Sequence, residues 1–225
     1  MTAAVFASGS GTNFQALLDR EGREGARWTT RLLIVDRQGI AAVERAERAG
    51  VPVCHMPVKG RDPAEIGAAM LAVLRAAKIE VIFLAGYLRL VPAAVTEAFR
   101  HRILNVHPAL LPAFGGQGMW GQAVHEAVLR SGARVSGVTV HFVDECYDEG
   151  SIFAQWPVPV REGDDARALA ARVLEVEHLL YPLAAQHLCR ALAVGADAVP
   201  LALPSGAFSL GASKLGLSDL VAEAF

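Results

Sequence analysis

The segment Asn105-Val106-His107-Pro108 places an amide and an imidazole two residues apart, at the end of an apolar run, Ile103 to Val106. The run has strand character, and alternate side chains of a strand point to the same side. Asn105 and His107 should therefore face one cleft, where an amide donor and an imidazole suit a developing oxyanion and a proton transfer. The competing interpretation is a histidine that ends the strand with its partner in the core.

The acidic turn from Asp144 to Gly150 lies between two expected strands and is a candidate to reach the same cleft. Acidic turns are usually only solvated, but a carboxylate beside His107 would favour the imidazolium and raise its pKa. Asp144 and Asp148 both qualify, and their spacing does not choose between them.

Two further loops suggest ligand binding. Ser8-Gly9-Ser10-Gly11-Thr12-Asn13 joins an expected strand to an expected helix, where free N–H groups attract a phosphate. It is not the Gly-x-Gly-x-x-Gly fingerprint, because Phe14 stands where the third glycine should be. The loop from Gly86 to Val91 mixes apolar side chains with backbone polar groups, which suits a flat heteroaromatic ring. An ordinary strand-to-helix turn is the alternative for both loops.

The other polar candidates have plainer interpretations. The seven histidines form no His-Glu-x-x-His or comparable cluster, so no metal is expected. His125 and Glu126 are assigned to the polar face of a helix, and Glu177-His178 to a solvated face of the last helix.

Strand and helix patterns alternate through the first half of the chain. Strands are expected at residues 3–7, 32–35, 51–56, 81–85 and 103–106, and helices at 13–20, 40–49, 64–77 and from Pro92. This order predicts an α/β, Rossmann-like fold: an open, mostly parallel twisted sheet with helices on both faces. Ligands bind beyond the carboxyl ends of the strands in such sheets, which is where three of the candidate loops lie.

The pattern changes after residue 107. A Pro/Gly-rich loop, 110–121, and a helix, 122–129, precede an alternating strand, 135–143, and its antiparallel C-terminal partner, 152–160. Asp164 is expected to N-cap a long helix to about Arg190, which Pro182 should kink or interrupt. Residues 1–200 are expected to form one domain, and residues 201–225 a weakly ordered tail or a short closing hairpin.

Composition narrows the function classes. The chain has 225 residues, is 53% hydrophobic with a mean hydropathy of +0.34, and carries a net charge of -2 without a Lys/Arg block. It therefore predicts no nucleic-acid partner and no membrane partner. Three cysteines without C-x-x-C spacing, and an N-terminus without a signal-peptide pattern, favour the cytoplasm.

The residues described above carry a resemblance. The chain resembles the folate-dependent formyltransferases from residue 3 to about 190, and among them the enzymes that formylate glycinamide ribonucleotide in purine biosynthesis. The matching motifs are Ser8-Gly-x-Gly-Thr-Asn13, Leu84-Ala-Gly-Tyr-Leu-Arg89, Leu104-Asn-Val-His-Pro-Ala-Leu-Leu-Pro112, Val140-His-Phe-Val143 with Asp148, and Glu177-His178 before Tyr181-Pro182.

The resemblance implies a mechanism. The donor would be 10-formyltetrahydrofolate, whose formyl carbon is attacked by the amine of glycinamide ribonucleotide. Asn105 and protonated His107 would hydrogen-bond the resulting oxyanion. Asp148 would keep His107 charged and help move the amine proton through water.

The resemblance also implies the binding residues. The backbone of Gly11, Thr12 and Asn13 would hold the ribonucleotide phosphate, and Glu177 would accept hydrogen bonds from the ribose hydroxyls. The folate would be bound by Arg61, at its glutamate tail, and by Leu88, Arg89, Leu90, Val91, Asn105, Asp144, Glu145, Cys146, Tyr147 and Asp148. The resemblance leaves open whether the protein is a monomer or a homodimer.

One stretch departs from the family pattern. Many relatives read Pro-Gly and then a histidine after Leu111-Pro112, whereas this chain continues with Ala113 and the glycine-rich segment Gly115 to Gly121. Three rival functions remain: a formyl-folate deformylase, a formyltransferase acting on initiator tRNA, and a non-catalytic nucleotide-binding module. The first two usually carry an extra domain that is not expected here, and the Asn-x-His motif with its acidic turn speaks against the third.

Overall fold

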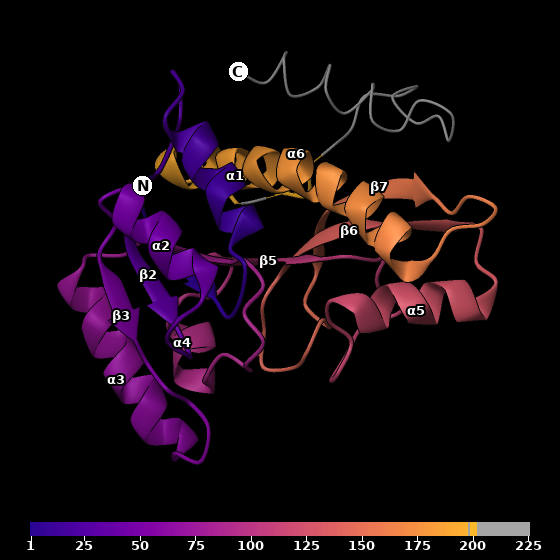
Figure 1. Cartoon of the computed structure of the whole chain (residues 1–225). Coiled ribbons are helices and arrows are strands. Elements are labelled where there is room, and N and C mark those ends of the chain that lie inside the picture. The colour runs from indigo at the N-terminus through magenta and orange to yellow at the C-terminus, as the bar shows by residue number, and fades with distance from the viewer. Residues whose placement is uncertain (198, 202–225) are drawn as a thin grey trace.

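The computed structural model of the chain describes residues 1–197 and 199–201, which form a single seven-stranded sheet flanked by helices (Figure 1). The strands are β1 (Thr2–Ala7), β2 (Thr29–Val35), β3 (Val53–His55), β4 (Val81–Leu84), β5 (Ile103–His107), β6 (Val135–Phe142) and β7 (Ile152–Pro159). The helices are α1 (Thr12–Glu21), α2 (Ala41–Arg48), α3 (Pro63–Ala76), α4 (Ala93–Ala98), α5 (Gln122–Ser131) and α6 (Ala166–Ala193). The expected C-terminal tail lies outside the described residues.

The strands are arranged in the order β3-β2-β1-β4-β5-β6-β7. The first five are parallel, β6 is antiparallel to β5, and β7 is antiparallel to β6. This topology confirms the expected α/β fold with its antiparallel C-terminal strand pair. The expected strand at 51–56 is shorter, because only Val53–His55 pairs with β2.

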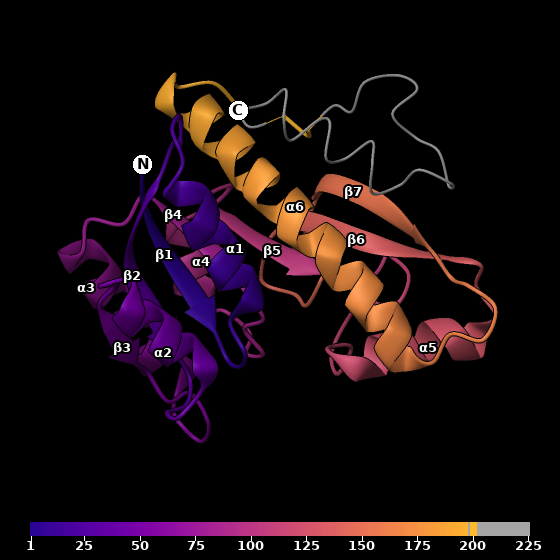
Figure 2. The same cartoon turned by 45° about the horizontal axis from the view of Figure 1, so that its top comes forward.

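Side-chain alternation along β1 divides the core into two layers. Ala3 and Val5 pack on the side of α1, α2 and α6, whereas Ala4 and Phe6 pack on the side of α3 and α4. All four side chains are fully buried, as period-two alternation requires of a central parallel strand with helices on both faces. Helix α6 crosses the first of these faces beside α1 (Figures 1 and 2).

The start of α6 corrects one expectation. The N-cap is Asp165, whose side chain accepts a hydrogen bond from the backbone N–H of Ala168 at 2.7 Å. Asp164 instead pairs with the guanidinium of Arg172, with an N–O distance of 2.7 Å. Two adjacent aspartates are equally good capping residues, and the ion pair decides which one is left to cap.

Pro182 does not interrupt α6, which continues from Ala166 to Ala193. A proline inside a helix removes one backbone hydrogen bond and crowds the preceding turn. Both sides of Pro182 are held by packing, because Tyr181 and Leu183 are buried in the core. No helix in the described residues is long and apolar enough to cross a membrane.

The strand order reverses between β1 and β4: these strands are neighbours in the sheet although two strands separate them in the sequence. The loops after these strands diverge there, and the backbone N–H of Ser8 donates to the carbonyl of Gly86 at 3.0 Å. A cavity of about 990 Å³ opens at this edge of the sheet. Ligand sites of open α/β sheets lie at such a switch point.

The Tyr181 hydroxyl ties α6 to the sheet directly below this cavity. Its oxygen lies 3.0 Å from the carbonyl oxygen of Leu84, the last residue of β4, and 2.9 Å from that of Leu104, the second residue of β5. Tyr181 is fully buried, so its single proton is shared between two acceptors away from water. The contact therefore fixes the separation of β4 and β5 from the helix.

We expect Tyr181→Phe to lower the free energy of unfolding by about 1–3 kcal/mol, because it removes the donor to two buried carbonyls. Tyr87→Phe is the matched control, since the buried Tyr87 hydroxyl has no hydrogen-bond partner among the described residues. Its effect should stay within about 0.5 kcal/mol. Urea denaturation of both variants measures the difference, and equal losses would contradict the role given to Tyr181.

Candidate active site

Asn105 and His107 occupy the carboxyl end of β5 and both line the large cavity. The antiparallel register places His141 of β6 opposite Asn105 and Thr139 opposite His107. Strand alternation thus brings Asn105 and His107 to the same cavity wall, as expected from their spacing. His107 is only 3% exposed, so its ring is held within the wall.

Asp148 is the carboxylate that reaches this pair. Its Oδ2 lies 3.5 Å from Nδ1 of His107, and its Oδ1 lies 3.5 Å from the amide nitrogen of Asn105. The backbone N–H of Gly116 donates to Oδ2 at 3.0 Å. Asp144 is exposed and caps its own turn by accepting from the backbone N–H of Cys146 at 2.9 Å. The geometry therefore favours Asp148 over Asp144 as the partner of His107.

The Asp148 carboxyl is held in its ionised form. Burial alone would raise its pKa, but the neighbouring His141 and His107 and the Gly116 N–H together outweigh burial and lower the pKa below its usual value. The backbone of Asp148 has a φ of 58°, in the left-handed region that aspartate enters more readily than most residues. The turn is thus shaped to present this carboxylate to β5 and β6.

The tautomer of His107 follows from its second neighbour. Nε2 lies 2.9 Å from the carbonyl oxygen of Phe114, which can only accept, so Nε2 carries a proton. Nδ1 then faces Asp148 and is the ring nitrogen available for proton transfer.

The expectation for the pKa of His107 holds for the effect of the carboxylate but not for the net shift. Burial lowers the pKa of His107. Asp148 and the Phe114 carbonyl raise it, but the resulting pKa stays below the usual value for histidine. The carboxylate acts in the expected direction, but burial was not visible in the sequence. The resting imidazole is therefore mostly neutral at pH 7.

His141 is a site residue that the sequence analysis missed. Its Nδ1 lies 2.8 Å from the carbonyl oxygen of Phe142, and its Nε2 lies 3.0 Å from the amide nitrogen of Asn105. The first contact requires a proton on Nδ1, and the ring then holds Nε2 between the Asn105 amide and Oδ1 of Asp148, which is 3.5 Å away. Its position opposite Asn105 depends on the register of β5 and β6, which the sequence did not supply.

The loop that was expected to hold a phosphate lies across the cavity from β5. Gly11, Thr12 and Asn13 all line the cavity at the start of α1. Gly11 has a φ of 68°, and a Cβ there would lie 2.9 Å from the backbone of Ala42 in α2. Glycine is therefore required by both conformation and space.

Glu177 of α6 contacts the loop of residues 8–13 and is not exposed to solvent. Its carboxylate accepts a hydrogen bond from the Asn13 amide at 2.5 Å, and it lines the cavity although it is only 7% exposed. Burial raises its pKa to about 7, and the Asn13 bond opposes that rise. The solvated helix face expected for this residue is wrong, whereas the ribose contact implied by the resemblance stays a prediction.

The segment expected to surround a flat ring enters the cavity only in part. Leu88 and Arg89 line it, and the Arg89 guanidinium donates to Asp36 at 2.7 Å. Leu90 is 42% exposed and Val91 is buried in the core with α3 and α4, so neither side chain lines the cavity.

The remaining expected folate contacts divide in the same way. Tyr147 lines the cavity together with Asp148, whereas Asp144, Glu145 and Cys146 are exposed and do not. Arg61 is exposed in the loop before α3 and also lies outside the cavity lining, where it donates to the carbonyl of Pro57 at 3.4 Å. Their contacts with a ligand stay predictions.

The glycine-rich loop and α5 form the last wall of the cavity. Trp120 lines the cavity and is 55% exposed, which leaves its ring free to contact a ligand. His125 is buried at 4% exposure and also lines the cavity, so its expected place on a polar helix face is wrong. Among the described residues, no group of three or more histidine, cysteine, aspartate or glutamate side chains is arranged to hold a metal ion.

Comparison with known proteins matches residues 1–185 of this chain to the family described as "Formyl transferase". A phosphoribosylglycinamide formyltransferase of Bacillus subtilis (strain 168) is 38% identical over 180 residues, which cover 80% of this chain and 90% of that protein. A chloroplastic phosphoribosylglycinamide formyltransferase of Vigna unguiculata is 42% identical over 200 residues, covering 88% of this chain. The matched region spans 64% of the Vigna protein, less than two thirds of its length.

The fold is also similar to a solved structure. The crystal structure of phosphoribosylglycinamide formyltransferase from Bacillus halodurans superposes with a TM-score of 0.78 at 37% identity. The match covers 85% of this chain and 95% of that structure.

Replacing Asp148 by asparagine should lower the pKa of His107 further, because the loss of the carboxylate charge leaves burial less opposed. NMR titration of the imidazole resonances measures this pKa. Asp144→Asn is the matched control, because the same charge is removed from an exposed position in the same turn. A His107 pKa that stays unchanged in Asp148→Asn would disprove the coupling.

Proposed function

The chain belongs to the formyl transferase family, and from that premise we propose that it transfers a formyl group from 10-formyltetrahydrofolate to the amine of glycinamide ribonucleotide. The observation that carries this proposal is the convergence of Asn105, His107 and Asp148 on a cavity that the loop of residues 8–13 also lines. We further propose a cytoplasmic enzyme of purine biosynthesis, either monomer or homodimer.

The position of the ribonucleotide follows from the residues that line the cavity on the side of α1 and on the side of β5. The phosphate binds at the N–H groups of Gly11, Thr12 and Asn13, where the start of α1 favours an anion. The carboxylate of Glu177, next to Asn13, accepts hydrogen bonds from the ribose hydroxyls. The amine then points toward β5, where the formyl group of the folate meets it.

The folate lies on the other side of the reacting carbon. Leu88 and Arg89 at the end of β4 and Tyr147 beside Asp148 provide apolar contacts and backbone polar groups for the flat pterin ring. Leu90, Val91, Asp144, Glu145, Cys146 and Arg61 belong to the proposed folate site through the resemblance. Their side chains would meet the folate only after a change of the loops that carry them.

The reaction begins when the amine nitrogen attacks the formyl carbon. A C–N bond forms, and the carbonyl electron pair moves to oxygen to give a tetrahedral oxyanion. The Asn105 amide donates one N–H to His141 at 3.0 Å and the other to Asp148 at 3.5 Å. The longer contact is the one that the oxyanion replaces, so His141 holds the amide while its second N–H stabilises the developing charge.

The attacking amine must also lose a proton. Asp148, kept ionised by its neighbours, draws that proton through a water molecule, and His107 shares it through Nδ1. His107 becomes an imidazolium as negative charge develops on oxygen, since that oxygen and Asp148 offset its burial. The intermediate then collapses, the bond from the formyl carbon to folate nitrogen breaks, and the proton passes to that nitrogen.

The purified protein should convert glycinamide ribonucleotide to its formyl derivative when it is supplied with 10-formyltetrahydrofolate. Product formation is followed by mass spectrometry of the ribonucleotide and by the absorbance of the released folate. Hydrolysis of the folate with an unmodified amine would instead identify water as the acceptor, as in a deformylase.

Asp148→Asn should lower kcat by about 10²-fold or more, at the low end of general acid–base contributions, because the proton acceptor is lost. Glu149→Gln should keep kcat within about twofold, because Glu149 is exposed in the same turn and does not line the cavity. Steady-state kinetics at saturating substrates compares the two. Wild-type turnover in the Asp148 variant would mean that another group accepts the proton.

A further inference from the structure

The loop of residues 8–13 has little conformational restraint of its own. Gly9 and Gly11 flank Ser10, so the peptide groups between them can rotate at low steric cost. The direction of these peptide groups decides whether the loop can bind an anion, because N–H groups attract a phosphate and carbonyl oxygens repel it. The contacts that hold the carbonyls therefore determine what the loop can bind.

Helix α2 provides two of these contacts. The backbone N–H of Ala42, in the first turn of α2, donates to the carbonyl oxygen of Gly9 at 3.2 Å. The Nε atom of Arg45, three residues later, donates to the carbonyl oxygen of Ser10 at 2.9 Å. Two successive carbonyls of the loop are thus turned toward α2.

The directions of the loop N–H groups follow from those of the carbonyls. Both peptide groups are trans, so the N–H of each points opposite to its carbonyl. The N–H groups of Ser10 and Gly11 therefore point away from α2, and both residues line the large cavity. Successive N–H groups on one side of a turn form a concavity that binds anions.

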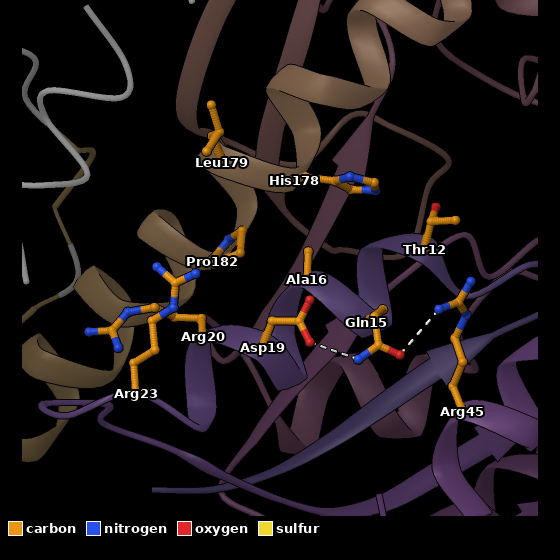
Figure 3. Close-up of a pocket in the computed structure, with 10 residues that line it drawn as sticks. All are labelled: Thr12, Gln15, Ala16, Asp19, Arg20, Arg23, Arg45, His178, Leu179 and Pro182. Carbon is orange, nitrogen blue, oxygen red and sulfur yellow. Dashed lines mark hydrogen bonds between the residues drawn. The ribbon is translucent and has the colours of Figure 1, made fainter. Parts of the chain in front are cut away.

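The Arg45 guanidinium is itself held in place. Its Nη1 donates to the side-chain oxygen of Gln15 in α1 at 3.1 Å, and the Gln15 amide nitrogen donates to Asp19 at 2.8 Å (Figure 3). The stem of Arg45 passes close to Gly11, since a Cβ at Gly11 would lie 3.4 Å from Cδ of Arg45. Arg45 thus links α2 to the loop and to the helix that follows the loop.

We propose that Arg45 is a positioning residue for the phosphate of the ribonucleotide: by holding the Ser10 carbonyl toward α2, it directs the Gly11 N–H to the phosphate. This inference rests on the proposed function, which places a phosphorylated substrate at the loop. Arg45 is half-buried and does not line the large cavity, so it acts through the loop and does not contact the reacting atoms.

Isothermal titration calorimetry with glycinamide ribonucleotide tests the proposal on the whole chain. Arg45→Met should weaken binding by about tenfold, the effect of losing one charge-assisted hydrogen bond, while an unbranched stem remains beside Gly11. Arg48→Met is the matched control, because Arg48 is exposed on the same helix and its Nε donates to the carbonyl of Glu44 at 3.2 Å, within α2. The affinity of this control should stay within about twofold of the wild-type affinity.

Glycinamide riboside, which lacks the phosphate, separates positioning from a general loss of structure. Its affinity should agree within about twofold between the wild type and Arg45→Met, because the contact that Arg45 supports is absent from that complex. In steady-state kinetics, Arg45→Met should raise the KM for the ribonucleotide by about tenfold and keep kcat and the KM for the folate within about twofold.

Two results would contradict the role given to Arg45: ribonucleotide binding that is unchanged in Arg45→Met, or equal losses of affinity for the ribonucleotide and the riboside. Neither result would affect the proposed function, because the wild-type protein would still formylate the ribonucleotide. A wild-type protein that binds the ribonucleotide without formylating it would overturn the proposed function alone, and one that does not bind it would overturn both.

Discussion

The Asp148 carboxylate joins segments that no other single group connects among the described residues. It contacts His107 and Asn105 on β5, His141 on β6 and the backbone of Gly116 in the glycine-rich loop. A buried carboxylate needs such partners to remain charged, and each partner is oriented by the contact in return. One ionised group thus contacts both strands and the loop, and the bond from His107 to the Phe114 carbonyl adds a second link between β5 and that loop.

The ionisable side chains around the cavity differ in charge state because their neighbours offset the cost of burying a charge to different degrees. Burial favours the neutral form of every ionisable side chain there, yet Asp148 has enough donors to stay ionised. His107 has two acceptors and still falls below its usual pKa. Glu177 has the Asn13 amide, and its pKa remains near 7. Two carboxylates in one cavity therefore respond differently to pH because one has more partners than the other.

Local periodicity predicted most of the sheet, and with it the shared face of Asn105 and His107. What it did not predict depends on contacts between distant segments. His141 meets Asn105 through the register of β5 and β6, which no local pattern encodes. The pKa of His107 depends on how deeply the ring is buried, and the N-cap of α6 depends on Arg172 holding Asp164 in an ion pair. Each of these outcomes required the packed structure.

The close approach of Gly11 to Ala42 has a consequence for how such a sequence can diverge. A methyl group at position 11 would meet the backbone of α2, and a longer side chain at position 42 would meet the phosphate loop from the other side. The two positions therefore constrain each other, so variants at one can be accepted only with a matching shift at the other. Variant libraries would best keep this pair fixed and draw their diversity from the glycine-rich loop around Trp120.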